Sequence, residues 1–524
     1  MSTSAAIARK SEPPRRAIIA AVLLVAGFKL YLAASLGLFQ DEAFYWMESQ
    51  RLAPAYSDIP PLTAFVIRAG TEVFGTHVLG VRSFFLLAGA VVPLLLYWLA
   101  RPIVGTRDAW LAAGCALLMP LVAVAVGAVA VADSLLIPVS LVFFGAFERA
   151  TRTAEFKWWW LAGIALALGL LAHYRFATVA LAGIVYLFFS ANGRRMLKTP
   201  GPWLSAALGA LGLLPVLWFS FAQDHQALQF QFVDRHPWSF DPAGLKFVLD
   251  QALLTTPLLF GFLVAAWIRL GREARRGDDR RRLLWLFATF PAGIYFLLSP
   301  FMGQQFETFH WPLIGYFPLV VVIPDLLRSA KRWLASATVA LSIVLTVAAA
   351  AVLSLQGHTD YLHRNLPGLV FKKNSNFAGW QTMAERAGTW LDRLNGDDLV
   401  LVGDHYVTAA QLSFYTGRTA YTTEPWKLAN DGRAPQMRIW ELDEVGLAEQ
   451  RGRDALVVYL AAERGRYTPD RHRAALDRMC RMFEEVEHLD RLDLWGGIKV
   501  FDYYLGKQVG GGPARNCPLT QPSD

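Results

Sequence analysis

The sequence has little of what marks a soluble enzyme or a disulfide-rich secreted domain. It has three cysteines in 524 residues, and 18% of its residues are charged, against about 25% in a typical soluble domain. No P-loop, HExxH, GxSxG or paired CxxC pattern occurs, so the sites that these patterns mark are not predicted. Cys480 and Cys517 both fall in the last part of the chain, and a single disulfide between them is a hypothesis.

Hydrophobic residues dominate instead. They make up 54% of the chain, with 18 Trp, 34 Phe and a mean hydropathy of +0.33, which is typical of a polytopic membrane protein. The apolar run 17–38 is too long for a secretory signal and has no small-x-small cleavage site before Asp41, so we expect a retained anchor. The twenty-residue criterion predicts about eleven spans in all. The others are expected at about 79–100, 109–126, 134–148, 158–172, 176–191, 202–222, 247–268, 283–300, 310–327 and 333–355.

Basic residues predict the orientation of these spans. Lys and Arg cluster before the first span and in every second loop after it, including the run GREARRGDDRRR at 271–282. Since cytoplasmic loops carry an excess of positive charge, the amino terminus is predicted to be cytoplasmic and everything after Gln356 to lie outside. This topology explains the net charge of +8, so nucleic acid is not a predicted partner. The run 271–282 is expected to be a solvated loop near anionic lipid.

The first outer loop contains the largest group of candidate functional residues. Asp41 and Glu42 follow the first span directly, at a depth where carboxylates are costly and need a reason. A turn with Tyr56 and Asp58 comes next. Residues 62–74 then place their apolar side chains on one helical stripe, which predicts a helix lying in the membrane interface.

Other polar residues near membrane depth also fall on the outer side, where they are expected to line one cavity. Asp133 opens a span in an apolar, small-residue stretch, either as a helix cap or as a site residue. His173, Tyr174 and Arg175 form a short outer turn. This turn is either an interfacial anchor or a set of ligands for a lipid phosphate.

Three further features carry similar alternatives. Arg82, near the start of the second span, is expected to meet a phosphate or a carboxylate. His310 is either a helix-end histidine or a functional one. The loop 221–240 mixes aromatic, acidic and His residues and is long enough to cover a site.

Residues 357–524 form a different kind of sequence. We expect a small α/β domain packed over the outer cavity, with residues 1–356 as the membrane domain. Its role is either a structural lid or acceptor recognition. Strands are predicted within 397–406, 454–463 and 496–506, and helices within 408–417 and 470–486.

Several of these segments resemble a known family. DEAFYWMESQRL at 41–52, followed by AYSDIPPL at 55–62, resembles the first outer loop of GT-C glycosyltransferases that use polyprenyl-phosphate sugars. The most similar subgroup contains the aminoarabinose transferase of lipid A and the galacturonosyltransferases of lipopolysaccharide, with protein mannosyltransferases as further relatives. Other similar segments are ADSLL at 132–136, LGLLAHYRFA at 168–177, PVLWFSFAQDHQALQFQF at 215–232, HWPLIGY at 310–316, GW at 379–380 and DHYVTAAQLSFYTGR at 404–418.

The resemblance implies a mainly α, polytopic GT-C fold with interfacial helices in the first outer loop and a C-terminal periplasmic α/β domain. It places an aspartate of the first outer loop, here Asp41, at the catalytic centre as general base. Glu42 and Asp133 are the neighbouring catalytic carboxylates. Arg82 and Arg175 are expected to stabilise the phosphate leaving group. The other residues expected at the substrate site are Tyr56, Asp58, His173, Tyr174 and His310.

The resemblance also leaves a divalent metal open. Some relatives hold one near the first-loop carboxylates, and here Asp41, Glu42 and Asp133 could bind Mg²⁺ or Mn²⁺, or Zn²⁺ with an added His. The chain departs from the family at Ile59, because relatives often have a basic residue directly before the Pro-Pro pair. For that reason the predicted phosphate ligands are Arg82 and Arg175.

The predicted function is an inverting transferase of the cytoplasmic (inner) membrane. It moves a sugar from a polyprenyl phosphate to lipid A, lipopolysaccharide or another envelope glycan at the outer face, with membrane lipids as neighbours. Protein O-glycosylation is one alternative, and a lipid-linked-sugar transporter or flippase is another. Against a transporter, the sequence shows no repeated pair of broken spans and no ionisable residue at a span centre. The sugar stays open among hexose, aminosugar and uronic acid.

Overall fold

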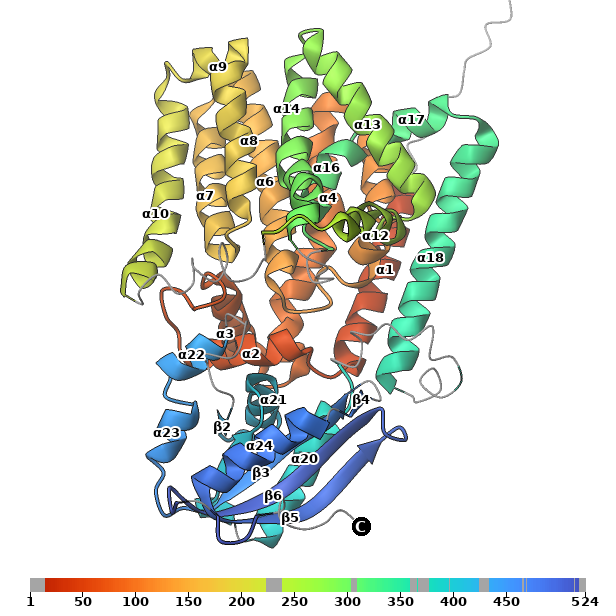
Figure 1. Cartoon of the computed structure of the whole chain (residues 1–524). Helices are drawn as coiled ribbons and strands as arrows, with labels where there is room; N and C mark the ends of the chain where they lie inside the picture. The colour runs from red at the N-terminus through yellow and green to blue at the C-terminus, as the bar shows by residue number, and fades with distance from the viewer. Residues whose placement is uncertain are drawn as a thin grey trace, which may run out of the picture.

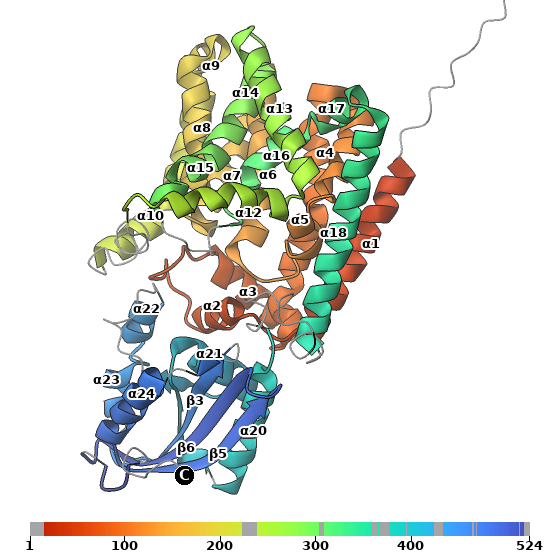
Figure 2. The same cartoon turned by 45° about the vertical axis from the view of Figure 1, so that its right-hand side comes forward.

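A helical bundle and a small sheet domain form the two ends of the molecule, and α2 (Gln40–Gln50) and α3 (Leu62–Phe74) lie between them (Figures 1 and 2). The fold is mainly α, as predicted. The computed structural model describes residues 15–222, 238–302, 309–358, 365, 377–394, 396–423, 433–463, 466–467, 469–512 and 514–517. Most of the predicted loop 221–240 therefore lies outside the described residues.

The bundle is built from helices that follow most of the predicted spans. In the described residues, six helices are long and apolar enough to cross a membrane, and a bent pair makes a seventh if it is counted as one span. The predicted number of about eleven is not confirmed by this criterion. The bundle helices are α1 (Arg15–Ser35), α4 (Val78–Ala116), α5 (Pro120–Val124), α6 (Ala132–Thr153), α7 (Phe156–Ala172), α8 (Phe176–Phe189), α9 (Ala191–Met196), α10 (Pro200–Ala222), η2 (Pro242–Lys246), α12 (Phe247–Leu254), α13 (Pro257–Arg275), α14 (Asp279–Ala288), η3 (Thr289–Gly293), α15 (Ile294–Leu298), η4 (Ser299–Phe301), α16 (Leu313–Val320), α17 (Ile323–Ser329) and α18 (Arg332–His358).

One predicted span is not a straight helix. Residues 247–268 were expected to cross as one segment, but α12 and α13 meet at an angle of 107°. Pro257 opens α13, and the preceding Thr256 has a positive φ of 71°. Because a proline disfavours helical backbone in the residue before it and lacks an N–H for the helical ladder, the helix breaks at this point.

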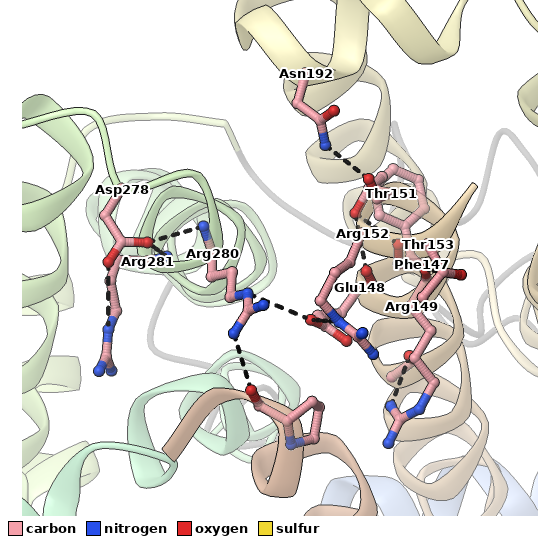
Figure 3. A network of polar contacts seen from close by, with 12 residues as sticks. Phe147, Glu148, Arg149, Thr151, Arg152, Thr153, Asn192, Asp278, Arg280 and Arg281 are labelled. Carbon is pink, nitrogen blue, oxygen red and sulfur yellow. Dashed lines mark hydrogen bonds and ion pairs between the residues drawn. The ribbon is translucent and has the colours of Figure 1, made fainter. Parts of the chain in front are cut away.

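The basic run 271–282 was expected to be a solvated loop, and this expectation is wrong in part. It forms the end of α13 and the start of α14, where Asp278 accepts from the backbone N–H groups of Arg280 and Arg281. Arg280 reaches the carbonyl of Pro102 at 3.0 Å and lies 3.9 Å from the buried Glu148 of α6 (Figure 3). These side chains join three helices at the end of the bundle far from the sheet.

The helix predicted over 62–74 is present as α3, with the same bounds, and its place in the membrane interface stays a prediction. Arg68 and Glu72 form an ion pair on its surface. Phe65 and Val73 are exposed, while small residues such as Ala64 and Gly70 face inward. The apolar stripe is thus free to meet the lipid interface.

The outer domain contains a mixed sheet. Within the described residues the strand order is β2-β1-β3-β6-β5, with β4 paired to β3. β1 is parallel to β2 and β3, and β6 is antiparallel to β3 and β5. The strands are β1 (Val400–Gly403), β2 (Ala420–Thr422), β3 (Ala455–Glu463), β4 (Arg466–Tyr467), β5 (Phe483–Leu494) and β6 (Lys499–Val509). The helical segments are α20 (Trp380–Arg393), η8 (Gly396–Asp398), α21 (Tyr406–Thr416), α22 (Ala434–Ile439), α23 (Glu444–Ala448) and α24 (Pro469–Met482).

The helix predicted over 470–486 ends earlier, since α24 stops at Met482 and Phe483 begins β5. Phe483, Val486 and Leu492 recur at multiples of three, which is a helical spacing. Phe483 and Val486 nevertheless pair regularly with β6, and a β-bulge between His488 and Asp490 shifts the register only before Leu492.

One hydrophobic cluster is shared by the bundle side and the outer domain. Phe44 and Trp46 of α2 and Phe85 of α4 belong to the same buried cluster as Tyr406 and Phe414 of α21. The rings of Phe44 and Tyr406 lie 5.4 Å apart, and those of Trp46 and Phe414 lie 5.2 Å apart. The outer domain therefore rests on α2 through a packed apolar contact.

The hypothesised disulfide is present between Cys480 of α24 and Cys517. The tail after β6 also pairs with the start of β5, because Val486 N donates to the carbonyl of Asn516 and Arg515 N to that of Glu484.

We expect the disulfide to stabilise the outer domain. It closes a loop with a sequence separation of 37, for which chain-entropy estimates give about 3–4 kcal/mol. Intact mass after alkylation should show no label on these two thiols before reduction and two labels after it. A Cys480→Ser/Cys517→Ser variant should unfold at lower temperature, and two free thiols in the unreduced protein would contradict the bond.

Candidate functional site

Glu42 and Arg82 form a fully buried clasp rather than part of an open site. Arg82 Nε and Nη2 donate to Glu42 Oε1 and Oε2 at 2.8 and 2.5 Å. Glu42 also accepts from the backbone N–H groups of Phe39 and Ala130. The remaining Arg82 donors bind the carbonyls of Ala33, Leu36 and Gly37.

This clasp gives Arg82 a carboxylate partner, which was one of its two expected partners, and it corrects the phosphate role of Arg82 and the site role of Glu42. All five N–H donors of Arg82 are used, so none is left for a phosphate. Both Glu42 oxygens are occupied, and the side chain has no exposed surface, so it is not placed to catalyse or to bind a metal. The pair instead joins the end of α1 to α2 and α4. Breaking it would be strongly destabilising, because a buried charge would be left without a partner.

The loop before α6 is fixed from three sides. Lys29 of α1 donates to the carbonyl of Val126 at 2.6 Å. Gly127 has a φ of 89°, and a Cβ there would lie 2.6 Å from the Cα of Gly89, so only glycine fits this approach. Ser134 Oγ accepts from Gly127 N at 2.9 Å. Lys29 lies in the second half of α1, four residues beyond its midpoint, which weakens the expectation that no ionisable residue lies at a span centre.

Asp41 lies at the start of α2 in a cluster that includes the outer domain. Arg433, directly before α22, donates from Nη1 to Asp41 Oδ1 at 2.8 Å and from Nε to Asp58 Oδ2 at 3.0 Å. Its Nη2 lies 3.1 Å from the hydroxyl of Tyr45, and Tyr406 completes the ring of contacts. The Asp41 side chain is 24% exposed, so it is reachable from outside this cluster.

Asp133, Arg175 and His310 form a second cluster, as the sequence predicted for one shared site. Arg175 Nη2 donates to Asp133 Oδ2 at 2.6 Å, and His310 Nε2 lies 3.2 Å from the same oxygen. The guanidinium also lies over the ring of Trp311, 5.3 Å from its centroid. Arg175 Nε and Nη1 are buried and have no hydrogen-bond partner in the described part of the chain. Such donors are costly unless a ligand meets them.

Tyr174 links the two clusters. It follows α7 beside Arg175, and the negative charge of Asp58 acts on it. Burial, followed by the charge of Asp58, raises the pKa of Tyr174, so its phenol stays a hydrogen-bond donor. Its hydroxyl is buried and without a hydrogen-bond partner among the described residues. Tyr174 is therefore a second donor available to a ligand between the clusters.

Two other predicted site residues shape the backbone. Tyr56 is fully buried, donates to the carbonyl of Glu48 and accepts from Ala53 N. His173 Nδ1 accepts from Arg175 N at 3.2 Å. These contacts fix the first-loop turn and the turn before α8, and we assign neither residue a substrate contact.

Glu48 of α2 is fully buried beside Asp58. Burial raises the pKa of Glu48 well above its usual range, and the charge of Asp58 and a hydrogen bond with it act in the same direction. The raised pKa favours the neutral carboxylic acid, which can donate a hydrogen bond to Asp58.

Replacement of Glu48 by Gln should therefore be tolerated, because the amide also donates to Asp58, whereas Glu48→Ala should destabilise the protein. A raised carboxyl pKa favours folding at low pH, and this contribution is lost as pH rises from about 4.5 through the raised pKa. Glu48→Gln should lack that part of the pH dependence of thermal unfolding. If Glu48→Gln unfolds as readily as Glu48→Ala, the carboxyl is ionised and this assignment is wrong.

The predicted metal set is not assembled. Glu42 is committed to Arg82, Asp133 to Arg175 and Asp41 to Arg433. Across the described residues no group of three or more His, Cys, Asp or Glu side chains is arranged to hold a metal ion. Since each carboxylate already has a cation, the residues present do not fit a metal, and we derive no step through one.

Comparison with known proteins identifies the group to which this arrangement belongs. The family model for dolichyl-phosphate-mannose-protein mannosyltransferase matches residues 58–219. Lipid A galacturonosyltransferase RgtD of Rhizobium johnstonii is 26% identical over 312 residues, which cover 56% of this chain and 63% of that protein. The crystal structures of ArnT from Cupriavidus metallidurans, apo and bound to undecaprenyl phosphate, align with a TM-score of 0.61 over 93% of this chain and 97% of ArnT, at 17% and 16% identity. The chain has the fold of ArnT over most of its length. The predicted fold is thus confirmed.

Sequence patterns missed three residues of the cluster around Asp41. Arg433 lies in the outer domain, 392 residues from the aspartate that it contacts, and no periodicity signals that approach. Glu48 and Tyr45 lie within the quoted first-loop motif, but their inward direction depends on α2 being a buried helix. A helical wheel over 40–50 was the available signal, because it places Asp41, Tyr45 and Glu48 on one face.

Proposed function

We propose that the protein transfers a sugar from a polyprenyl phosphate of the undecaprenyl type to a lipid A-type or other envelope glycan acceptor. The observation that carries the proposal is the pair of adjoining clusters. One presents the carboxylate of Asp41, and the other presents buried donors of Arg175 that have no hydrogen-bond partner among the described residues. A base beside an anion site is what a displacement at a sugar phosphate needs.

In this mechanism Asp41 accepts the proton of the acceptor hydroxyl as its oxygen attacks the anomeric carbon. The bond from that carbon to the phosphate oxygen breaks, and the phosphate leaves with the bonding electron pair. Arg175 and the hydroxyl of Tyr174 stabilise the charge that grows on the phosphate. Attack opposite the leaving group inverts the anomeric configuration.

Topology and relatives support the placement at the outer face of the cytoplasmic membrane. α9, α17 and the α13–α14 junction, where basic residues cluster, lie at the bundle end far from the sheet domain (Figure 1). The positive-inside rule supports a cytoplasmic position for that end and a periplasmic position for α2 and the sheet domain. ArnT has been crystallised with undecaprenyl phosphate, and RgtD is described as acting on lipid A.

The proposal is tested with purified protein, a labelled polyprenyl-phosphate sugar and lipid A, in detergent and without any ion gradient. A labelled lipid A product would support the transferase. Labelled protein in place of labelled lipid A would favour the protein O-glycosylation suggested by the matched mannosyltransferase model. Movement of the intact donor across vesicles, with no transfer to any acceptor, would favour a flippase and contradict the proposal.

A further inference from the structure

Arg433 is held in place by a built interface between α22 and the first outer loop. One turn after Arg433, Gln436 is buried and accepts from the backbone N–H of Ser57 at 2.9 Å. Trp440, at the end of α22, packs its ring 5.7 Å from that of Phe44. The side chain of Arg433 itself is 14% exposed. A guanidinium placed by packing on both sides is more than a surface ion pair.

Arg433 contacts two carboxylates, those of Asp41 and Asp58. Burial disfavours its charged form, but the neighbouring Asp41, Tyr45, Tyr406 and Asp58 outweigh this and raise the pKa of Arg433 well above its usual range. Because Asp41 Oδ1 already accepts from Arg433, this oxygen is masked as a proton acceptor while the contact lasts.

Among the described residues, Arg175 is the arginine that the adjoining anion site offers to a phosphate. Arg82 was expected to be the second phosphate ligand, but its donors all bind Glu42 or backbone carbonyls. Arg175 shares its charge with Asp133. A phosphate entering beside Arg175 and Tyr174 would bring negative charge within reach of Asp58, which is unfavourable unless a second cation meets it. Arg433 contacts Asp58, and the charge of Asp58 acts on Tyr174, so we take Arg433 as that second cation.

We propose that Arg433 is a phosphate ligand that the unliganded protein stores on Asp41, and that donor binding draws it onto the phosphate and so unmasks the base. The inference rests on the proposed function. When the acceptor oxygen bonds to the anomeric carbon, its proton passes to Asp41 and the phosphate gains one negative charge. Arg433 and Arg175 share that charge, and Arg433 returns to Asp41 when the lipid phosphate leaves.

The test uses the full-length protein in lipid nanodiscs with undecaprenyl phosphate as the probe, together with the donor KM and kcat of transfer. Arg433→Gln should weaken undecaprenyl phosphate binding and raise the donor KM by about tenfold or more, since a charge-assisted hydrogen bond is lost. Arg433→Lys should retain part of the affinity. Arg438→Gln is the matched control, because Arg438 lies on the same helix but pairs with Asp443, and it should bind like wild type.

A double variant separates phosphate binding from simple charge balance. If Arg433 only neutralises Asp58, Arg433→Gln/Asp58→Asn should recover wild-type binding and donor KM, and the inference is then overturned. If Arg433 binds the phosphate, the double variant should fold normally and stay weak. Wild-type protein that transfers no sugar would overturn the proposed function. Transfer by wild type together with undiminished undecaprenyl phosphate binding by Arg433→Gln would overturn this inference alone.

Discussion

Asp41→Asn is expected to lower sugar transfer by ~10²-fold or more at matched expression, the size of effect that general bases commonly supply. The amide cannot take the proton of the acceptor hydroxyl, but its oxygen can still accept from Arg433, so folding and donor binding should persist. The measurement is transfer from a labelled polyprenyl-phosphate sugar in a membrane fraction, with thermal unfolding of the purified variant beside it.

Asp108→Asn is the control for Asp41→Asn. Asp108 is also an arginine-paired carboxylate, with Arg328 at 2.7 Å, but it lies at the other end of the bundle, so this variant should transfer like wild type. Full activity of Asp41→Asn would refute general-base catalysis by Asp41. Asp133 would then be the next base to examine, because Glu42 has no free oxygen.

Arg175→Gln is expected to lower kcat/KM by about 10- to 100-fold, the factor for a hydrogen bond to a charged group worth about 1.5–3 kcal/mol. It removes the two buried donors that have no protein partner in the described part of the chain. Arg175→Lys should fall between wild type and Arg175→Gln, because a lysine keeps the charge but not the planar fork.

Thermal unfolding and Arg328→Gln serve as checks on this result. Arg328 pairs with Asp108 far from the site, so its loss should leave transfer unchanged. If Arg175→Gln loses stability but keeps its donor KM, the residue only balances Asp133 and the assigned anion site is wrong.

The sequence was most informative where hydrophobic periodicity and local motifs coincide. The bounds of α3, the opening of α6 next to Asp133, and the turn with Tyr174 and Arg175 all follow from patterns within a few residues. The meeting of Asp133, Arg175 and His310 was also expected, because each lies at the same end of its helix and an unpaired charge at that depth needs a partner.

Side-chain direction was the part that the sequence could not provide. Asp41 and Glu42 are adjacent and chemically alike, yet Glu42 turns into the clasp with Arg82 while Asp41 turns toward Arg433. Their fates differ because successive helix positions point about 100° apart, and which face is inward depends on α4 and α21 packing against α2. The same limit hid Arg433, whose contact with Asp41 depends on how the outer domain docks.

The shared cluster beneath the outer domain has a consequence for cooperativity. Phe44 and Trp46 lie in the same buried cluster as Tyr406 and Phe414, so α2 cannot keep its shape if the sheet domain melts. The segment before Gln356 has a composition suited to lipid, and the segment after it has one suited to water. This change in composition does not separate two independent folding units. A destabilising substitution in the sheet is therefore expected to disturb the position of Asp41 as well. Loss of activity after a substitution in the sheet domain need not mean that the substituted residue contacts the substrate.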